Sequence, residues 1–239
     1  MKLFLLTAVG VTACALLGSS AASATTISFR QGENGYADAS NSSFNYDGTN
    51  ASTQVRMDLP DALQPAGSYA HLLFGNIVGV GGIPAGSSVQ SATLEGWVTN
   101  AFESATVARL LQDIENRPMS PDRIDDAAFA GNFYDDTTAV FATHAPCGIC
   151  DSPEQISWDV TAMVQAWVDG ATNDGFLILP DTKNGGNLAP VGDATVSFRP
   201  LLTVTMVVAV PEPSSGLLLA AGFGGLAALR ARRRPASPR

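Results

Sequence analysis

Short apolar runs separated by turn-forming residues fill the chain between residues 25 and 208 and most constrain its fold. Runs of this kind, a few residues long and bounded by Gly, Pro, Asn and Asp, are typical of β-strands. Seven are apparent: Ile27 to Arg30, His71 to Phe74, Val89 to Val98, Thr106 to Leu111, Ile156 to Asp159, Phe176 to Leu179 and Leu201 to Val208. Their spacing predicts an all-β protein, an antiparallel jelly-roll-like sandwich. The segment is long enough for one domain with a sizeable core.

One segment departs from the strand pattern. Its apolar residues recur at helical spacing, at Val160, Met163, Val164, Trp167 and Val168. Asp159 is available as N-cap and Gly170 as a stop, so we expect one short helix. Asn173-Asp174-Gly175 then supplies positive φ angles for a tight turn into the next strand. Trp158 and Trp167 lie beside and within the helix, and we expect them to pack in the core.

The N-terminus reads as a targeting segment. Met1-Lys2, an apolar run from Leu3 to Leu17 and small residues up to Ala24 form the three parts of a secretory signal peptide, residues 1–24. A second interpretation is a lipobox at Val11-Thr12-Ala13-Cys14, which would lipidate the cysteine. The apolar run before Cys14 is very short, which favours the signal peptide.

The C-terminus has three parts as well. Pro211, Glu212 and Pro213 precede an apolar stretch that ends at Leu229, and a basic cluster follows at Arg230, Arg232, Arg233 and Arg234. An arginine cluster resists translocation, so a single hydrophobic helix here would leave everything before Pro211 outside the inner membrane. A plain tail anchor is one interpretation.

Residues 210–234 also resemble the PEP-CTERM sorting signal of Gram-negative bacteria. The resemblance implies an exported protein that is held transiently in the inner membrane by its C-terminal helix. It further implies that an exosortase removes this tail, and that the protein travels to the cell surface or the extracellular matrix together with polysaccharide.

Charge argues against a nucleic-acid partner. Only 15% of the residues are charged, and Asp and Glu outnumber Lys and Arg by 22 to 13. Much of the positive charge lies at the two ends, at Lys2 and within residues 230–239. The middle of the chain is therefore strongly acidic and repels phosphate backbones.

Short motifs are spread through residues 25–208: Phe29-Arg30-Gln31-Gly32, Asn34-Gly35-Tyr36, Leu73-Phe74-Gly75-Asn76-Ile77, Ile83-Pro84-Ala85-Gly86, Trp158-Asp159-Val160-Thr161, Val164-Gln165-Ala166-Trp167, Gly175-Phe176 and Arg199-Pro200-Leu201-Leu202. Their residues and order resemble the DNRLRE domain. The resemblance implies a jelly-roll β-sandwich of a type found in secreted enzymes and matrix proteins and grouped with carbohydrate-binding modules. It does not extend to the segment between Asn116 and Glu154.

Cys147-Gly148-Ile149-Cys150, with His144 three residues earlier, is the most distinctive local motif. A redox dithiol needs its first cysteine at a helix N-terminus, whereas this pair lies in a loop rich in Pro and Gly. A zinc site needs a full tetrahedral ligand set, for which His71 in a strand would have to be recruited. Outside the cytoplasm a disulfide between Cys147 and Cys150 fits the compartment, and we predict it.

Catalytic and metal-binding signals are weak. A cluster of carboxylates lies at Asp122, Asp125, Asp126, Asp135 and Asp136. A solvated acidic loop is the first interpretation, and a structural calcium site the second, without EF-hand spacing. The sequence has no Gly-x-Ser-x-Gly elbow, and a pair of glycosidase carboxylates cannot be identified from sequence. We therefore expect no catalytic residues and no cofactor.

Aromatic residues among turn formers are the binding-site candidates, because sugar C–H faces stack on exposed rings. We expect Tyr36, Tyr46 and Tyr134 in loops where burial is hard to argue, and Trp97 at a strand end where it could serve either role. The favoured prediction is a non-catalytic exported protein that binds or is embedded in extracellular polysaccharide. The alternatives are a structural biofilm or envelope protein without a specific ligand, and a polysaccharide-acting enzyme.

Overall fold

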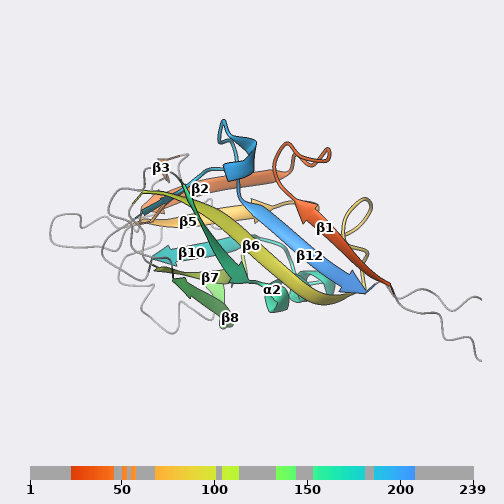
Figure 1. Ribbon diagram of the computed structural model, residues 1–239. Coiled ribbons are helices and arrows are strands. Elements are labelled where there is room, and N and C mark those ends of the chain that lie inside the picture. Colours follow the sequence, from red (N-terminus) through yellow and green to blue (C-terminus); the bar gives the residue numbers. More distant parts are fainter. Residues whose placement is uncertain are drawn as a thin grey trace, which may run out of the picture. The chain divides into compact units, whose positions relative to one another are not determined.

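The computed structural model describes residues 23–45, 50–52, 55–57, 68–100, 104–112, 133–143, 153–180 and 186–207. These residues belong to one compact unit, Ser23–Ala209. Two antiparallel sheets pack as a sandwich with one short helix (Figure 1). The predicted mostly-β sandwich is thereby confirmed, whereas most of the signal peptide and all of the C-terminal helix lie outside the described residues.

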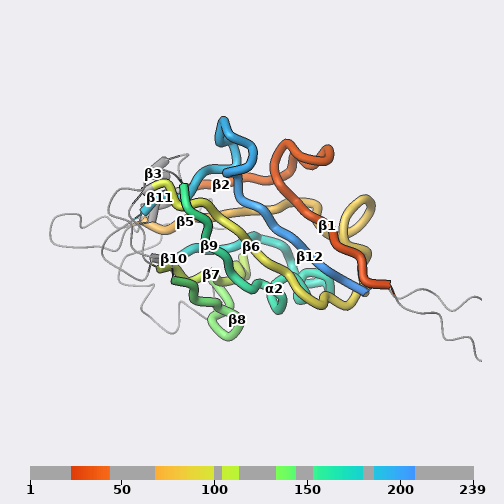
Figure 2. The backbone as a smooth tube through the Cα atoms, viewed as in Figure 1, coloured from red at the N-terminus to blue at the C-terminus, as the bar shows by residue number. Residues whose placement is uncertain are grey.

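Sheet A has the strand order β1-β12-β6-β11-β4, and β9 also pairs with β6. The strands are β1 Ala24–Phe29, β4 Val55–Met57, β6 Ser88–Asn100, β9 Glu154–Asp159, β11 Gly186–Leu188 and β12 Leu201–Val207. The first and last strands run side by side, with Ala24 opposite Val207 (Figure 2). In the described part of the sheet, β1 is an edge strand, so one side of its backbone has no strand partner.

Sheet B has the order β3-β2-β5-β10-β7-β8. The strands are β2 Ala39–Asn45, β3 Asn50–Ser52, β5 Ser68–Phe74, β7 Ser104–Leu110, β8 Tyr134–Thr143 and β10 Phe176–Pro180. Each of the seven predicted strands has a counterpart in the two sheets. The sequence did not indicate β2, β3, β4, β8 and β11, because they are very short or rich in Ser, Asn, Asp and Thr.

The main core lies between the two sheets, and two tryptophans span it. Trp158 of β9 is 1% exposed, and its indole N–H donates to the carbonyl oxygen of Ala105 in sheet B at 3.0 Å. Trp167 is 2% exposed, with its ring centroid 4.9 Å from that of Phe176. The core role predicted for both tryptophans is confirmed.

The predicted helix is confirmed as α2, Thr161–Val168, with Met163, Val164, Trp167 and Val168 buried. The predicted N-cap at Asp159 is wrong, because Val160 occupies the N-cap position without a side-chain cap hydrogen bond. The Asp159 carboxylate accepts instead from the Thr161 backbone N–H at 3.0 Å, and Gly170 follows the helix at φ +105°. Helix α2 is joined to β6 because the Gln165 side-chain oxygen accepts from the Val89 N–H at 2.7 Å. No helix in the described part of the chain is long and apolar enough to cross a membrane.

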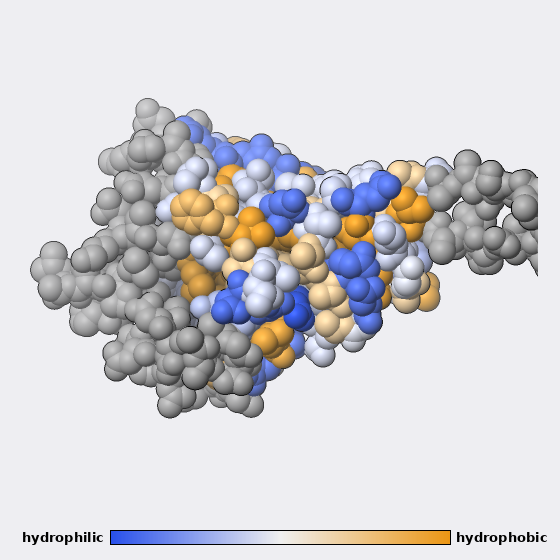
Figure 3. All heavy atoms as spheres, turned by 90° about the horizontal axis from the view of Figure 1, so that it is seen from below, coloured by the Kyte–Doolittle hydropathy of each residue, from blue (hydrophilic) through white to orange (hydrophobic). Residues whose placement is uncertain are grey.

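Sheet B buries side chains on both faces. Phe176 and Ile178 belong to the main core, whereas the alternate residues Leu177 and Leu179 belong to a second cluster with Tyr69, Ala108, Leu110 and Tyr134. On the face of the molecule shown in Figure 3, the hydrophobic residues are scattered among hydrophilic ones.

Candidate functional site

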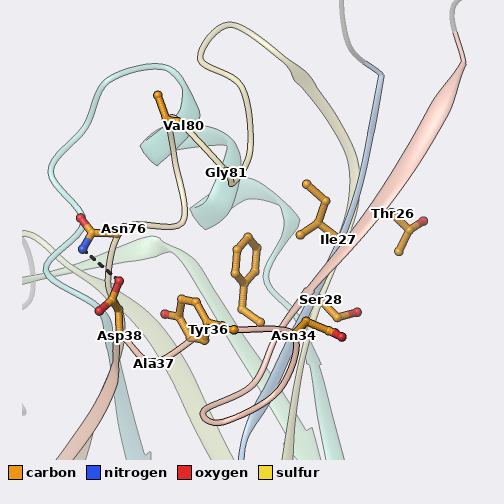
Figure 4. A pocket seen from close by; sticks show the side chains of 12 residues that line it. Thr26, Ile27, Ser28, Asn34, Tyr36, Ala37, Asp38, Asn76, Val80 and Gly81 are labelled. Atoms are coloured by element: carbon orange, nitrogen blue, oxygen red, sulfur yellow. Dashed lines mark hydrogen bonds between the residues drawn. The ribbon is translucent and has the colours of Figure 1, made fainter.

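A surface pocket of about 540 Å³ lies along the edge strand β1 (Figure 4). Three segments form it: residues 26–29 of β1, residues 34–38 of the loop that leads to β2, and residues 76, 80 and 81 of the loop after β5. Sites for small ligands commonly enclose about 300–1,000 Å³. The pocket is therefore large enough for a small ligand or for one or two units of a polymer.

The loop after β1 turns back on itself and carries the pocket residues with it. The Gly32 N–H donates to the Tyr36 carbonyl oxygen at 2.8 Å, and Asn34 adopts a left-handed φ of 50° at the tip. Arg199 fixes the loop from the other end of the sequence, because its Nη1 donates to the Gln31 carbonyl oxygen at 2.8 Å. Gly32 has a φ of +83°, which favours glycine, and a Cβ there would lie 2.7 Å from this nitrogen.

Tyr36 forms the boundary between the pocket and the core. Its ring meets Phe29 edge-on at 5.3 Å between centroids and stacks on Phe74 at 6.4 Å. Its hydroxyl donates to the Gly75 carbonyl oxygen at 3.0 Å. Burial, and next the negative charge of Asp38, raise the pKa of the Tyr36 phenol well above its usual value, so the hydroxyl keeps its proton. The ring is only half-buried, and the part that the core leaves uncovered lines the pocket.

Polar side chains form one wall of the pocket. Asn76 Nδ2 donates to Asp38 Oδ2 at 3.1 Å, and both side chains are exposed on the side opposite Ile27 (Figure 4). Asn34 and Asn76 are the only non-glycine residues with positive φ in the described part of the chain, at 50° and 51°. Asparagine tolerates a left-handed backbone conformation better than most residues. Non-glycine residues in this conformation are uncommon and cluster at functional sites.

Val80 stands at the rim of the pocket, on the loop between β5 and β6 (Figure 4). The loop is closed by hydrogen bonds from the Gly79 N–H to the Ile83 oxygen at 2.8 Å and from the Ile83 N–H to the Ile77 oxygen at 2.7 Å. Val80 itself is fully exposed. The rim of the pocket therefore combines an isolated apolar side chain with polar groups.

Of the predicted aromatic candidates, Tyr36 lines the pocket, although its ring is partly covered by the core rather than free. Tyr46 lies outside the described residues. The predicted loop position of Tyr134 is wrong, because Tyr134 begins β8 opposite Leu110 and is 8% exposed in the second cluster. The polar residues Asp135 and Asp136 follow Tyr134 directly, so the start of this strand resembles a loop in the sequence.

Trp97 lies in β6 and does not line the pocket. It is half-buried, and the Arg30 guanidinium carbon lies 5.3 Å from its ring centroid, a cation–π arrangement. One ring face is therefore already occupied by a protein group. The predicted binding role of Trp97 stays a prediction.

The remaining candidates have mixed positions. Cys147, Cys150, His144 and the first three aspartates of the acidic cluster lie outside the described residues, so the disulfide stays a prediction. Asp135 pairs with Arg109 at 3.0 Å, and although burial opposes it, hydrogen bonds from Thr137 and Arg109 lower the pKa of Asp135. The described residues contain no group of three or more His, Cys, Asp or Glu arranged to hold a metal ion.

The sequence did not single out Asn34, Asp38, Asn76 and Val80 as pocket residues. The available signals were the turn formers around them, Asn34-Gly35 and Gly79-Val80-Gly81. Those signals predict loops, but they do not indicate that the two loops meet beside β1. That meeting depends on the long-range bond between Gly75 and Asp38, whose backbone N–H and carbonyl oxygen lie 2.9 Å apart.

The fold and the pocket define a β-sandwich protein with a surface site on an edge strand. Beyond the described residues, the profile of the PEP-CTERM protein-sorting motif matches residues 209–234. The predicted sorting signal is thereby confirmed, and proteins with this motif are exported, processed by an exosortase and sorted to the cell surface. A search of curated proteins found no match to the chain.

Proposed function

We propose that this protein is a non-catalytic polysaccharide-binding protein of the cell surface or extracellular matrix of a Gram-negative bacterium, held transiently in the inner membrane before an exosortase acts. The observation that carries the proposal is the β1 pocket, where a half-buried ring meets a wall of exposed hydrogen-bonding side chains. The resemblance to the DNRLRE domain and the company of polysaccharide implied by the sorting signal support it.

The pocket residues match the two kinds of surface on a sugar ring. A pyranose offers apolar C–H faces, for which Tyr36, Ile27 and Val80 supply apolar contact. It also offers hydroxyls, which donate and accept hydrogen bonds. The Asp38 carboxylate accepts, whereas the side-chain amides of Asn34 and Asn76 both donate and accept.

We infer that the β1 pocket binds a polysaccharide without cleaving it. Among the lining residues, Asp38 is the only one with an ionisable carboxylate. Most glycosidases use a pair of carboxylates on either side of the scissile bond. The single carboxylate of the lining therefore supports the proposal that the pocket binds a sugar without cleaving it.

The experiment measures retention of the mature protein by a panel of extracellular polysaccharides in affinity electrophoresis. The double variant Asn34→Gly/Asn76→Gly removes both amides, while glycine keeps the positive φ at each position. Two lost hydrogen bonds at about 1 kcal/mol each weaken binding by about tenfold or more. Gln90→Ala is the control, because Gln90 is an exposed amide of β6 outside the pocket.

Three results contradict the proposal. The wild-type protein could fail to bind every polysaccharide in the panel, which would favour a structural protein without a specific ligand. The double variant could bind as well as the wild type and melt at the same temperature, which would remove the pocket from the binding site. Release of new reducing ends from any polymer would indicate an enzyme.

A further inference from the structure

The only charged side chain that lines the β1 pocket is negative. The lining residues include one carboxylate, that of Asp38, and no lysine, arginine or histidine. The Asp38 side chain accepts from Asn76 through Oδ2, at 3.1 Å, and Asp38 is exposed and lines the pocket. A carboxylate has two acceptor oxygens, so Asp38 retains the capacity to accept a hydrogen bond from a ligand beside the one from Asn76.

The described guanidinium groups are already engaged outside the pocket. Arg30 pairs with Glu33 at 3.0 Å and covers the Trp97 ring. Arg199 donates to two backbone carbonyl oxygens, those of Gln31 and Asp193, each at 2.8 Å. Arg109 pairs with Asp135 in sheet B. An anionic ligand in the pocket would meet Asp38 without a cation from these residues to pair with.

We propose that the β1 pocket accepts uncharged sugar units and rejects uronic-acid units, and that Asp38 is the residue that sets this preference. The inference rests on the proposed function of the pocket. A hydroxyl of a neutral sugar donates to the Asp38 carboxylate, which satisfies both groups. A uronate carboxylate has no proton to donate and places a second negative charge beside the first, the kind of repulsion that builds specificity.

The test compares polymers that differ in charge alone. Polygalacturonate and alginate are each paired with their carboxyl-reduced, uncharged forms, and the affinity of the mature protein is measured at low salt. We expect the uncharged form of at least one pair to bind about tenfold more tightly than its acidic parent. Added salt should narrow the difference, because it screens charge repulsion.

Asp38→Asn keeps the shape of the side chain and removes its charge, so it should strengthen binding of the acidic polymer. The ratio of the affinity for the uncharged polymer to the affinity for its acidic parent should then fall at least about threefold. The matched control is Asp136→Asn, since Asp136 is an exposed aspartate on β8 of sheet B and its substitution changes the net charge equally. The control should leave the ratio unchanged.

Equal binding of acidic and uncharged forms by the wild type overturns the selectivity but leaves the proposed function in place. An equal change in both Asp→Asn variants also overturns it, because the effect would then come from net charge. If none of the four polymers binds, and no other polysaccharide does, the proposed function fails and the selectivity with it. Melting temperatures of both variants establish that they are folded.

Discussion

The core between the sheets and the β1 pocket both contain aromatic rings, but the rings have different surroundings. Trp158 and Trp167 are almost completely enclosed by protein. Tyr36 has one part of its ring against Phe29 and Phe74 and the rest in the pocket. The difference indicates that substitutions in the core change mainly stability, whereas substitutions on the pocket rim change mainly binding.

The two regions are nevertheless joined. Phe74 stacks on Tyr36 and meets Phe176 at 6.4 Å, and Phe176 in turn meets Trp167 at 4.9 Å between centroids. Tyr36 is thus the last ring in a series that begins at helix α2. Its position depends on the core, whereas the polar side chains around it are carried by the loops that follow β1 and β5.

The largest effect is expected in the core. Trp158→Ala and Trp167→Ala should each lower the free energy of unfolding by about 3–5 kcal/mol, as deletions of large buried rings do. The measurement is urea denaturation followed by circular dichroism. Trp97→Ala is the matched control, since Trp97 is only half-buried on β6 and should cost clearly less. Equal losses in the free energy of unfolding for all three variants would mean that Trp97 stabilises the fold as much as the two core tryptophans do.

The next effect concerns the turn into β10. Gly175 has φ +91°, and a Cβ there would lie 2.7 Å from the Leu72 carbonyl oxygen and 2.8 Å from His71 Nε2. Gly175→Ala should lower the free energy of unfolding by about 1–3 kcal/mol from backbone strain, with the clash in addition. Gly170→Ala is the control, because Gly170 has φ +105° but nothing within 4 Å of a Cβ. The clash explanation fails if both variants lose the same amount.

Local patterns account for the parts of the fold that the sequence predicted. The apolar runs specified seven strands, and α2 followed from Val164 and Trp167 on one face with Gly170 at its end. The turn predicted at Asn173-Asp174-Gly175 forms only in part: Gly175 alone of the three has a positive φ, +91°, and the Asn173 side-chain oxygen accepts from the Gly175 N–H at 3.2 Å. In these segments the signal lies within a few residues of the element that it specifies.

The pocket and β8 had no such local signal. Asp38 and Asn76 are 38 positions apart in sequence and meet only because β2 pairs with β5. Tyr134 was misplaced because the polar residues Asp135, Asp136, Thr137 and Thr138 follow it in β8, and because sheet B buries side chains on both of its faces. Long-range pairing, rather than residue type, decides which loop residues are buried and which line a site.

A smaller effect is expected at Tyr36. Tyr36→Phe keeps the ring contacts and removes the hydrogen bond to the Gly75 oxygen, which should cost about 1 kcal/mol. Burial and Asp38 raise the pKa of the Tyr36 phenol in the folded state. Above the ordinary tyrosine pKa of about 10, the unfolded chain therefore loses this proton more readily, and stability falls as pH rises.

This pH dependence separates the hydroxyl from the ring. The contribution of Tyr36 is fully present below pH of about 10 and is lost as pH rises above it. Urea denaturation at pH 8 and at alkaline pH should show a shallower decline for Tyr36→Phe than for the wild type. Parallel declines would mean that the Tyr36 hydroxyl is not held as the hydrogen bond to Gly75 requires.

The smallest effect on stability, and the sharpest contrast with the core, is expected at Val80. Val80 is fully exposed between Gly79 and Gly81, which both have positive φ, so its side chain contributes no core contact. Val80→Ser should change the free energy of unfolding by less than about 0.5 kcal/mol. It should nevertheless weaken polysaccharide binding by a few fold, because it removes apolar area from the pocket rim.

Phe141→Ser is the control, since Phe141 is an exposed apolar residue on β8 of sheet B, away from the pocket lining, and should leave binding unchanged. A marked loss of stability at Val80 would place it in the core, and unchanged binding would remove it from the site.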